Sequence, residues 1–125
     1  ALYETAFQEE FLSLRLDDPA YLTRRLESVM RYANRIERDL ADFVPAASPD
    51  VRAMQIAERE RLSDVLRDKV RTPLGGLAID EDTDAAAVRR QLEQVSAELE
   101  RIEGALERIP SLGLVTERGG GPSRG

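Results

Sequence analysis

Apolar residues recur at alternating spacings of four and three along two stretches of the chain. The first stretch has these positions: Leu22, Leu26, Val29, Ala33, Ile36, Leu40 and Phe43. The second has Val88, Leu92, Val95, Leu99, Ile102, Leu106 and Ile109. A 3.5-residue period sustained over successive heptads is typical of helices that pack along left-handed coiled-coil seams. The pattern therefore predicts long helices over 19–44 and 83–109.

A third and less regular apolar stripe predicts another long helix over 49–71. Its positions are Val51, Met54, Ala57, Leu62, Val65, Leu66 and Val70. The stripe loses its phase after Met54 and regains it at Leu62. Glu58 and Arg61 lie near the apolar face in this interval. Two interpretations stay open, namely charged side chains that flank a core helix and reach water, or a polar contact with a partner.

Proline residues mark the expected helix boundaries. Asp18 and Ser48 each precede a proline, and a capping side chain followed by proline at the first helical position is a common helix start. Later prolines are expected to end the helices before them, at Pro45, Pro73 and Pro110. The similar helix lengths and the short connection over 45–48 favour antiparallel neighbours.

A short helix is expected over 3–16, with Phe7 and Phe11 on its apolar face. It would be a fourth helix of the bundle, or an arm that docks these two phenylalanines on another subunit. The predicted fold is thus all-α, an antiparallel helical bundle or coiled-coil hairpin with three long helices and one short N-terminal helix. We expect a single domain over 1–117, followed by a flexible glycine-rich tail over 118–125.

Two segments after the long helices share a proline, a short run of leucine and glycine, and then an acid. They are candidates for short strands over 74–79 and 112–116, or for loops that tuck a leucine under the end of the bundle. A strand in the second segment would offer Leu112, Leu114 and Val115 to the sheet edge of a partner protein.

The composition excludes several kinds of chemistry in this 125-residue chain. It has no cysteine and no histidine, which excludes disulfides, zinc ribbons, thiol nucleophiles and imidazole acid–base catalysis. Its charge is −6. No stretch approaches the ~18 uncharged apolar residues of a membrane span, and the acidic N-terminus does not resemble a secretory signal. We expect a protein of the cytoplasm, or of the inside of a particle assembled there, without a cofactor.

The acidic residues Asp80, Asp82 and Asp84 form the strongest concentration of one charge. They match the first ligand positions of a calcium loop, but Ala85 then stands where glycine is needed and Gln91 where a glutamate would close the site. No metal is therefore expected. The segment is either the capped, acidic start of a helix or an acidic contact surface at one end of the bundle.

Basic residues repeat every seven positions at Arg24, Arg31 and Arg38, opposite the first seam. The stripe is either a solvated face with acidic partners four residues away, or a contact for an anionic partner. Acids outnumber bases over 1–44, whereas nucleic-acid binding usually needs a basic domain. Nucleic acid is therefore not the favoured partner.

The C-terminal half has a helix, the acidic run 79–84 and a second helix. This arrangement resembles the coiled-coil hairpins of transcript-cleavage-type factors, which enter the secondary channel of RNA polymerase. The resemblance implies that the acidic tip acts on the polymerase, where tip carboxylates help to place Mg²⁺. Those factors also have a second, C-terminal domain, which does not follow here.

The sequence thus favours a non-catalytic helical interaction module. Such a module is an adaptor, an assembly chaperone or a structural subunit of a larger complex, for example a phage or secretion-type particle. Its partners would be proteins, including other copies of this chain in a homo-oligomer. The alternative is a regulator of transcription or nucleic-acid machinery that acts through the acidic hairpin tip. An enzyme that uses carboxylates and a divalent metal is the least favoured class.

Overall fold

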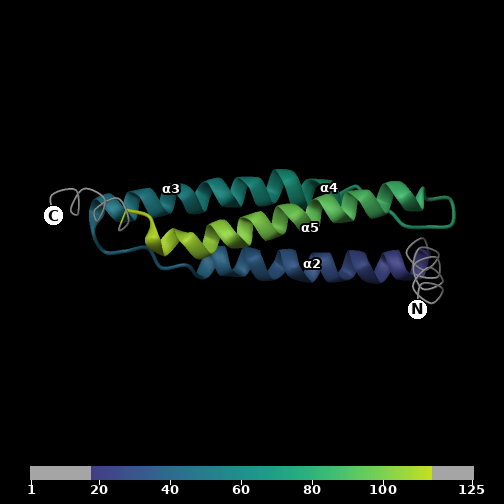
Figure 1. Cartoon of the computed structure of the whole chain (residues 1–125), viewed down its shortest axis with the longest axis horizontal. Helices are drawn as coiled ribbons and strands as arrows, with labels where there is room; N and C mark the ends of the chain where they lie inside the picture. The colour runs from purple at the N-terminus through teal and green to yellow at the C-terminus, as the bar shows by residue number, and fades with distance from the viewer. Residues whose placement is uncertain (1–17, 114–125) are drawn as a thin grey trace, which may run out of the picture.

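The computed structural model describes residues 18–113 and is helical in this part of the chain, without strands (Figure 1). Its long helices, which lie side by side, are α2 (Pro19–Asp42), α3 (Pro49–Leu66) and α5 (Ala85–Arg108). A π-helical turn, η1 (Arg67–Arg71), and the short helix α4 (Thr72–Gly75) continue directly from α3. A 3₁₀ turn, η2 (Ile109–Ser111), follows α5. The all-α class is confirmed, and the helix predicted over 3–16 lies outside the described residues.

Two of the long helices start at capping aspartates. Asp18 accepts a hydrogen bond from the backbone N–H of Ala20 at 3.1 Å, and proline follows it at the first helical position. Asp84 accepts from the N–H of Ala87 at 3.2 Å. Ser48 occupies the corresponding position before α3 but its side chain forms no capping bond. The aspartate caps satisfy N–H groups that lack a partner within the helix.

The helix that begins with α3 does not end before Pro73, as predicted, but continues to the end of α4. The N–H of Thr72 donates to the carbonyl of Arg67, five residues earlier, and so widens the helix just before the proline. In a regular α-helix the proline ring collides with the carbonyl four residues earlier. A π-helical turn changes the position of that carbonyl, and the helix therefore passes through Pro73.

The strand predicted over 74–79 is wrong for the same reason, because the segment begins inside α4 and then turns. The N–H of Leu77 donates to the carbonyl of Leu74 at 3.1 Å. Of the second predicted strand, over 112–116, only the first two residues are described, and Leu112 closes a turn there. All three leucines pack on or in the core, as expected for loops that tuck a leucine under the helix ends.

An apolar core runs between the long helices, and residues of both heptad seams belong to it. Every seam residue of α2 and α5 is buried or packs against the buried cluster. The partly buried members are Leu26, Phe43 and Leu106. The two seams therefore contribute to one core within the chain, which leaves the outer sides of the helices for other contacts.

The first half of α3 buries a different residue from those predicted. Met54 is 44% exposed and Ala57 is also exposed, whereas Gln55 is only 2% exposed. The stripe does not lose its phase, since Gln55 lies four residues after Val51 and seven before Leu62. Hydrophobicity alone missed this position, because backbone groups near the helix ends need a buried polar partner there.

Candidate interaction surface

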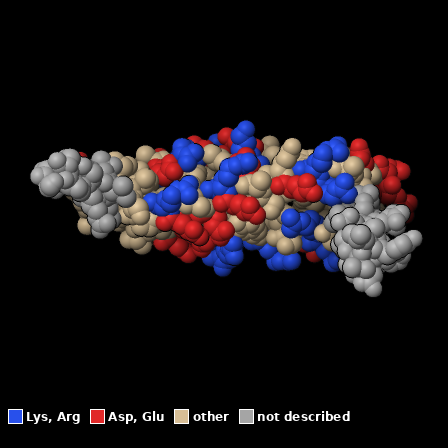
Figure 2. Space-filling model, in the orientation of Figure 1, with Lys and Arg blue, Asp and Glu red and all other residues tan. Residues whose placement is uncertain are grey.

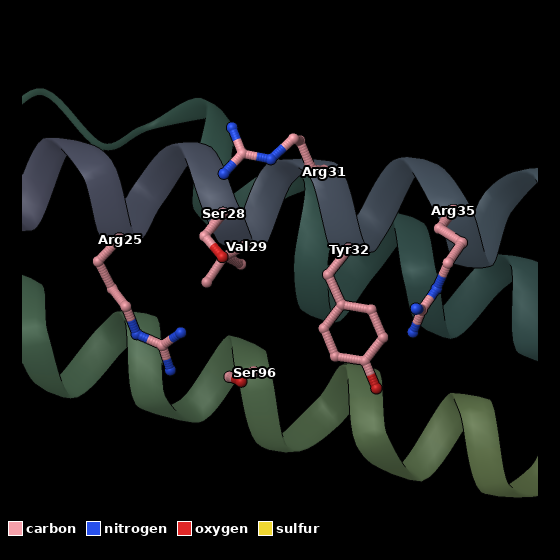
Figure 3. Close-up of a pocket in the computed structure, with 7 residues that line it drawn as sticks. All are labelled: Arg25, Ser28, Val29, Arg31, Tyr32, Arg35 and Ser96. Atoms are coloured by element: carbon pink, nitrogen blue, oxygen red, sulfur yellow. The ribbon is translucent and has the colours of Figure 1, made fainter.

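The outer side of α2 and α5 has a basic hollow and an acidic hollow along the groove between the two helices. The basic hollow, of about 440 Å³, is lined by Arg25, Ser28, Val29, Arg31, Tyr32, Arg35 and Ser96 (Figure 3). The acidic hollow, of about 300 Å³, is lined by Asp39, Asp42, Phe43, Glu103, Leu106 and Glu107. We call the surface formed by these two hollows the α2/α5 face.

The heptad pattern explains why these residues share one side of the molecule. In α2 the residues at 25, 32 and 39 recur every seven positions, and those at 28, 35 and 42 do the same. Both sets flank the buried seam, which begins at Leu22. Residues three and four apart are neighbours on a helix surface, so the two sets form a continuous strip. In α5, Ser96 and Glu103 flank the opposite seam in the same way.

A cluster of three side chains joins α2 to α5 between the two hollows. The hydroxyl of Tyr32 donates to Oε1 of Glu103 at 2.7 Å, and Arg35 donates to Oε2 at 2.8 Å. The Arg35 guanidinium carbon also lies 4.8 Å from the centre of the Tyr32 ring, within the range of a cation–π contact. Tyr32 and Arg35 both extend toward α5 in Figure 3. Their positions are thus held by a residue 71 positions away from Tyr32 in the sequence.

The same cluster changes the ionisation of the tyrosine. Burial, together with the hydrogen bond to Glu103, raises the pKa of Tyr32 to about 12. Both effects favour the neutral phenol, since an ionised ring would be less solvated and would face a carboxylate. Tyr32 therefore remains a hydrogen-bond donor at neutral pH.

We expect the difference in unfolding free energy between the wild type and Tyr32→Phe to shrink as the pH rises from 10 to 12. The pKa of Tyr32 is raised in the folded chain, so its stabilisation is complete below the ordinary value of 10.0 and is lost toward about 12. Urea unfolding followed by circular dichroism, at about pH 9 and about pH 11.5, measures this difference. A difference that stays constant would show that the phenol does not titrate as described.

Several charges on the α2/α5 face have no opposite charge beside them. Arg25 and Arg31 form no ion pair with any residue of 18–113, and the same holds for Asp39, Asp42 and Glu107 in the acidic hollow. Across α2 and α3, by contrast, a bridge exists. Its members are Arg71, Asn34 at 2.8 Å and Glu37 at 3.2 Å. The α2/α5 face therefore leaves charge available to a partner.

The predicted arginine stripe is exposed as expected, but the structure groups its members differently. Arg24, Arg31 and Arg38 are exposed on α2, and of these only Arg31 lines the basic hollow. In Figure 3 it points along the outer side of α2, whereas Arg25 reaches toward α5. Sequence reasoning did not select Arg25 or Tyr32. The available signal was their seven-residue spacing on the flank of the seam.

The acidic segment forms the turn that leads into α5. Oδ1 of Asp80 accepts from the N–H of Asp82 at 2.9 Å, and the N–H of Asp80 donates to the Thr83 hydroxyl at 2.8 Å. Asp84 caps the helix. Asp80 and Asp84 thus use their carboxylates within the turn, and Asp82 is exposed. Residues 18–113 contain no group of three or more acidic side chains placed to hold a metal ion.

The remaining predicted contact residues lie near or beyond the limits of the described chain. Leu112 is partly buried against the core, so it does not present a free edge there. Phe7, Phe11, Leu114 and Val115 lie outside the described residues. The structure therefore brings together a different set of residues, from the flanks of α2 and α5, as the candidate surface.

Comparison of the chain with protein-family models, with curated proteins and with solved structures finds no match. Within residues 18–113, no helix combines the length and the apolar character needed to cross a bilayer. The functional argument therefore depends on the geometry and charge of the α2/α5 face.

Proposed function

We propose that this chain is a non-catalytic interaction module, an antiparallel helical bundle that binds another protein through its α2/α5 face. The observation that carries the proposal is the set of unpaired charges, grouped by sign, on either side of Tyr32. Tyrosine and arginine are the residue types most often found at the energetic centres of protein interfaces. An adaptor or structural subunit of the cytoplasm, or of a particle assembled there, fits this arrangement.

The state of the seams supports an outer contact surface. Because apolar residues of both seams are buried in one core, association need not open the bundle. Tyr32 and Arg35 are also held in place before binding by Glu103. A side chain that is already ordered loses less conformational entropy when a partner binds. This part of the face is therefore prepared for a contact.

The alternative, a regulator that acts through the acidic tip over 80–84, receives less support. The segment does lie at the turn before α5, in keeping with a hairpin tip. However, Asp80 and Asp84 already bond within the turn, so only part of the acidic charge is left for a polymerase or a metal. The α2/α5 face combines more unpaired groups with an aromatic side chain.

Site-specific cross-linking tests the proposal. A photo-crosslinking amino acid would replace Ser96, in the basic hollow, or Ser63 as a matched control in the groove between α2 and α3. In an extract of the native host, we expect several-fold more of one discrete protein adduct from position 96 than from position 63. An excess of unlabelled wild-type chain should remove the adduct, and an excess of the Arg25→Glu/Arg31→Glu variant should not. Equal adducts from both positions, or none, would contradict the proposal.

A further inference from the structure

We infer that the partner on the α2/α5 face is a second copy of this chain, packed in the opposite direction around a two-fold axis. In this arrangement Arg25 and Arg31 of each copy contact the acidic hollow of the other. The inference rests on the proposed function, since it names the partner of the same face. It follows from the order of the charges along the groove.

The basic and acidic residues of the face are separated by position. Because α2 and α5 run in the same direction (Figure 1), their C-terminal halves lie at the same end of the groove. That end carries Asp39 and Asp42 from α2 and Glu107 from α5, and Figure 2 shows acidic side chains gathered over this region. The other end carries Arg25 and Arg31. The face therefore has two oppositely charged halves.

A two-fold axis is the symmetry that matches these halves. The stretches 25–31 and 39–42 are about twelve residues apart between their centres, which corresponds to roughly 18 Å along the helix. Copies that face each other in the same direction would place like charges together. Reversing one copy places each basic half against an acidic half, with Tyr32 and Arg35 near the axis. Such self-complementary interfaces are the rule in homodimers.

Other occupants match only one half of the face. An acidic peptide or a nucleic-acid backbone would be attracted by Arg25 and Arg31 but repelled by Asp39 and Asp42, and a basic peptide would meet the reverse problem. Like charges in contact across an interface are a strong determinant against a wrong partner. A second copy satisfies both hollows at once. Because the charges are at the surface, we expect a dimer that weakens as salt is added.

Sedimentation equilibrium with charge-reversed variants tests the inference. Arg25→Glu/Arg31→Glu makes the face acidic throughout, and Asp39→Lys/Asp42→Lys makes its α2 strip basic. The wild type should dimerise, and each variant alone should associate at least about tenfold more weakly. An equimolar mixture of the two variants should recover association, because each reversed half then meets the opposite charge. Circular dichroism of each variant checks that it remains helical.

The matched control reverses two acids on the outer side of α3, Glu60→Lys/Asp64→Lys, and should leave association unchanged. A wild-type chain that stays monomeric, or a mixture that fails to recover association, would overturn the inference. Failure of the proposed function is a separate result. If the purified chain is monomeric while position 96 cross-links to a different protein, the face binds a partner but not a second copy.

Discussion

Replacing Leu99 with alanine is expected to lower the free energy of unfolding by about 3–5 kcal/mol. Leu99 lies in the middle of α5 with none of its surface exposed, inside the cluster that holds both seams. The substitution removes buried apolar groups and leaves a cavity between helices that can collapse only in part. Since small proteins are stable by about 5–15 kcal/mol, this loss would be a large fraction of the total. Urea unfolding followed by circular dichroism measures it.

The matched control is Leu106→Ala, seven residues further along the same seam. Leu106 packs against the core but remains partly exposed, so its truncation should cost about 1–2 kcal/mol. Equal losses at the two positions would mean that α5 is not buried along the seam as described. A loss at Leu99 below about 1 kcal/mol would lead to the same conclusion.

Gln55→Ala is expected to lower the free energy of unfolding by about 2–4 kcal/mol. Oε1 of Gln55 accepts from the N–H of Ala46 at 2.8 Å, and Nε2 donates to the carbonyl of Ile109 at 3.1 Å. One side chain thus joins α3 to the connection before it and to the end of α5. Its removal leaves a buried donor and a buried acceptor without partners, and each such group costs about 1–3 kcal/mol.

Two further variants separate the hydrogen bonds from the packing. Gln55→Met keeps most of the volume but cannot form either bond, so it should lose nearly as much stability as Gln55→Ala. Gln94→Ala, on an exposed part of α5, should change the unfolding free energy by less than about 0.5 kcal/mol. If Gln55→Met were as stable as the wild type, the buried amide would not be needed to join these segments.

The sequence predicts the long helices and most of the core because one physical rule decides both. In α2 and α5 the apolar spacing determines which side can be buried, and residues such as Ile36 and Ile102 are buried where that spacing places them. The rule failed where a local exception acted. A proline usually ends a helix, but the widened turn before Pro73 accommodates it, and nothing in the local pattern shows that turn.

The candidate site was less predictable because it is formed by two helices that are distant in the sequence. The stripe Arg24, Arg31 and Arg38 follows from the spacing along α2 alone. The contact between Tyr32 and Glu103 depends on how α2 and α5 are rotated about their axes and on their register, which the pattern of a single helix does not determine. Sequence reasoning could therefore find the charged surface of α2 but not the face that it forms with α5.

The account's central claim is that the long helices complete their core within one chain and leave the α2/α5 face for a partner. Thermal unfolding of the Arg25→Glu/Arg31→Glu variant, followed by circular dichroism across about a hundredfold range of concentration, tests it most directly. The account predicts a helical monomer whose melting temperature does not depend on concentration. A melting temperature that falls on dilution, with loss of helix, would show that the seams close between chains and would contradict the claim.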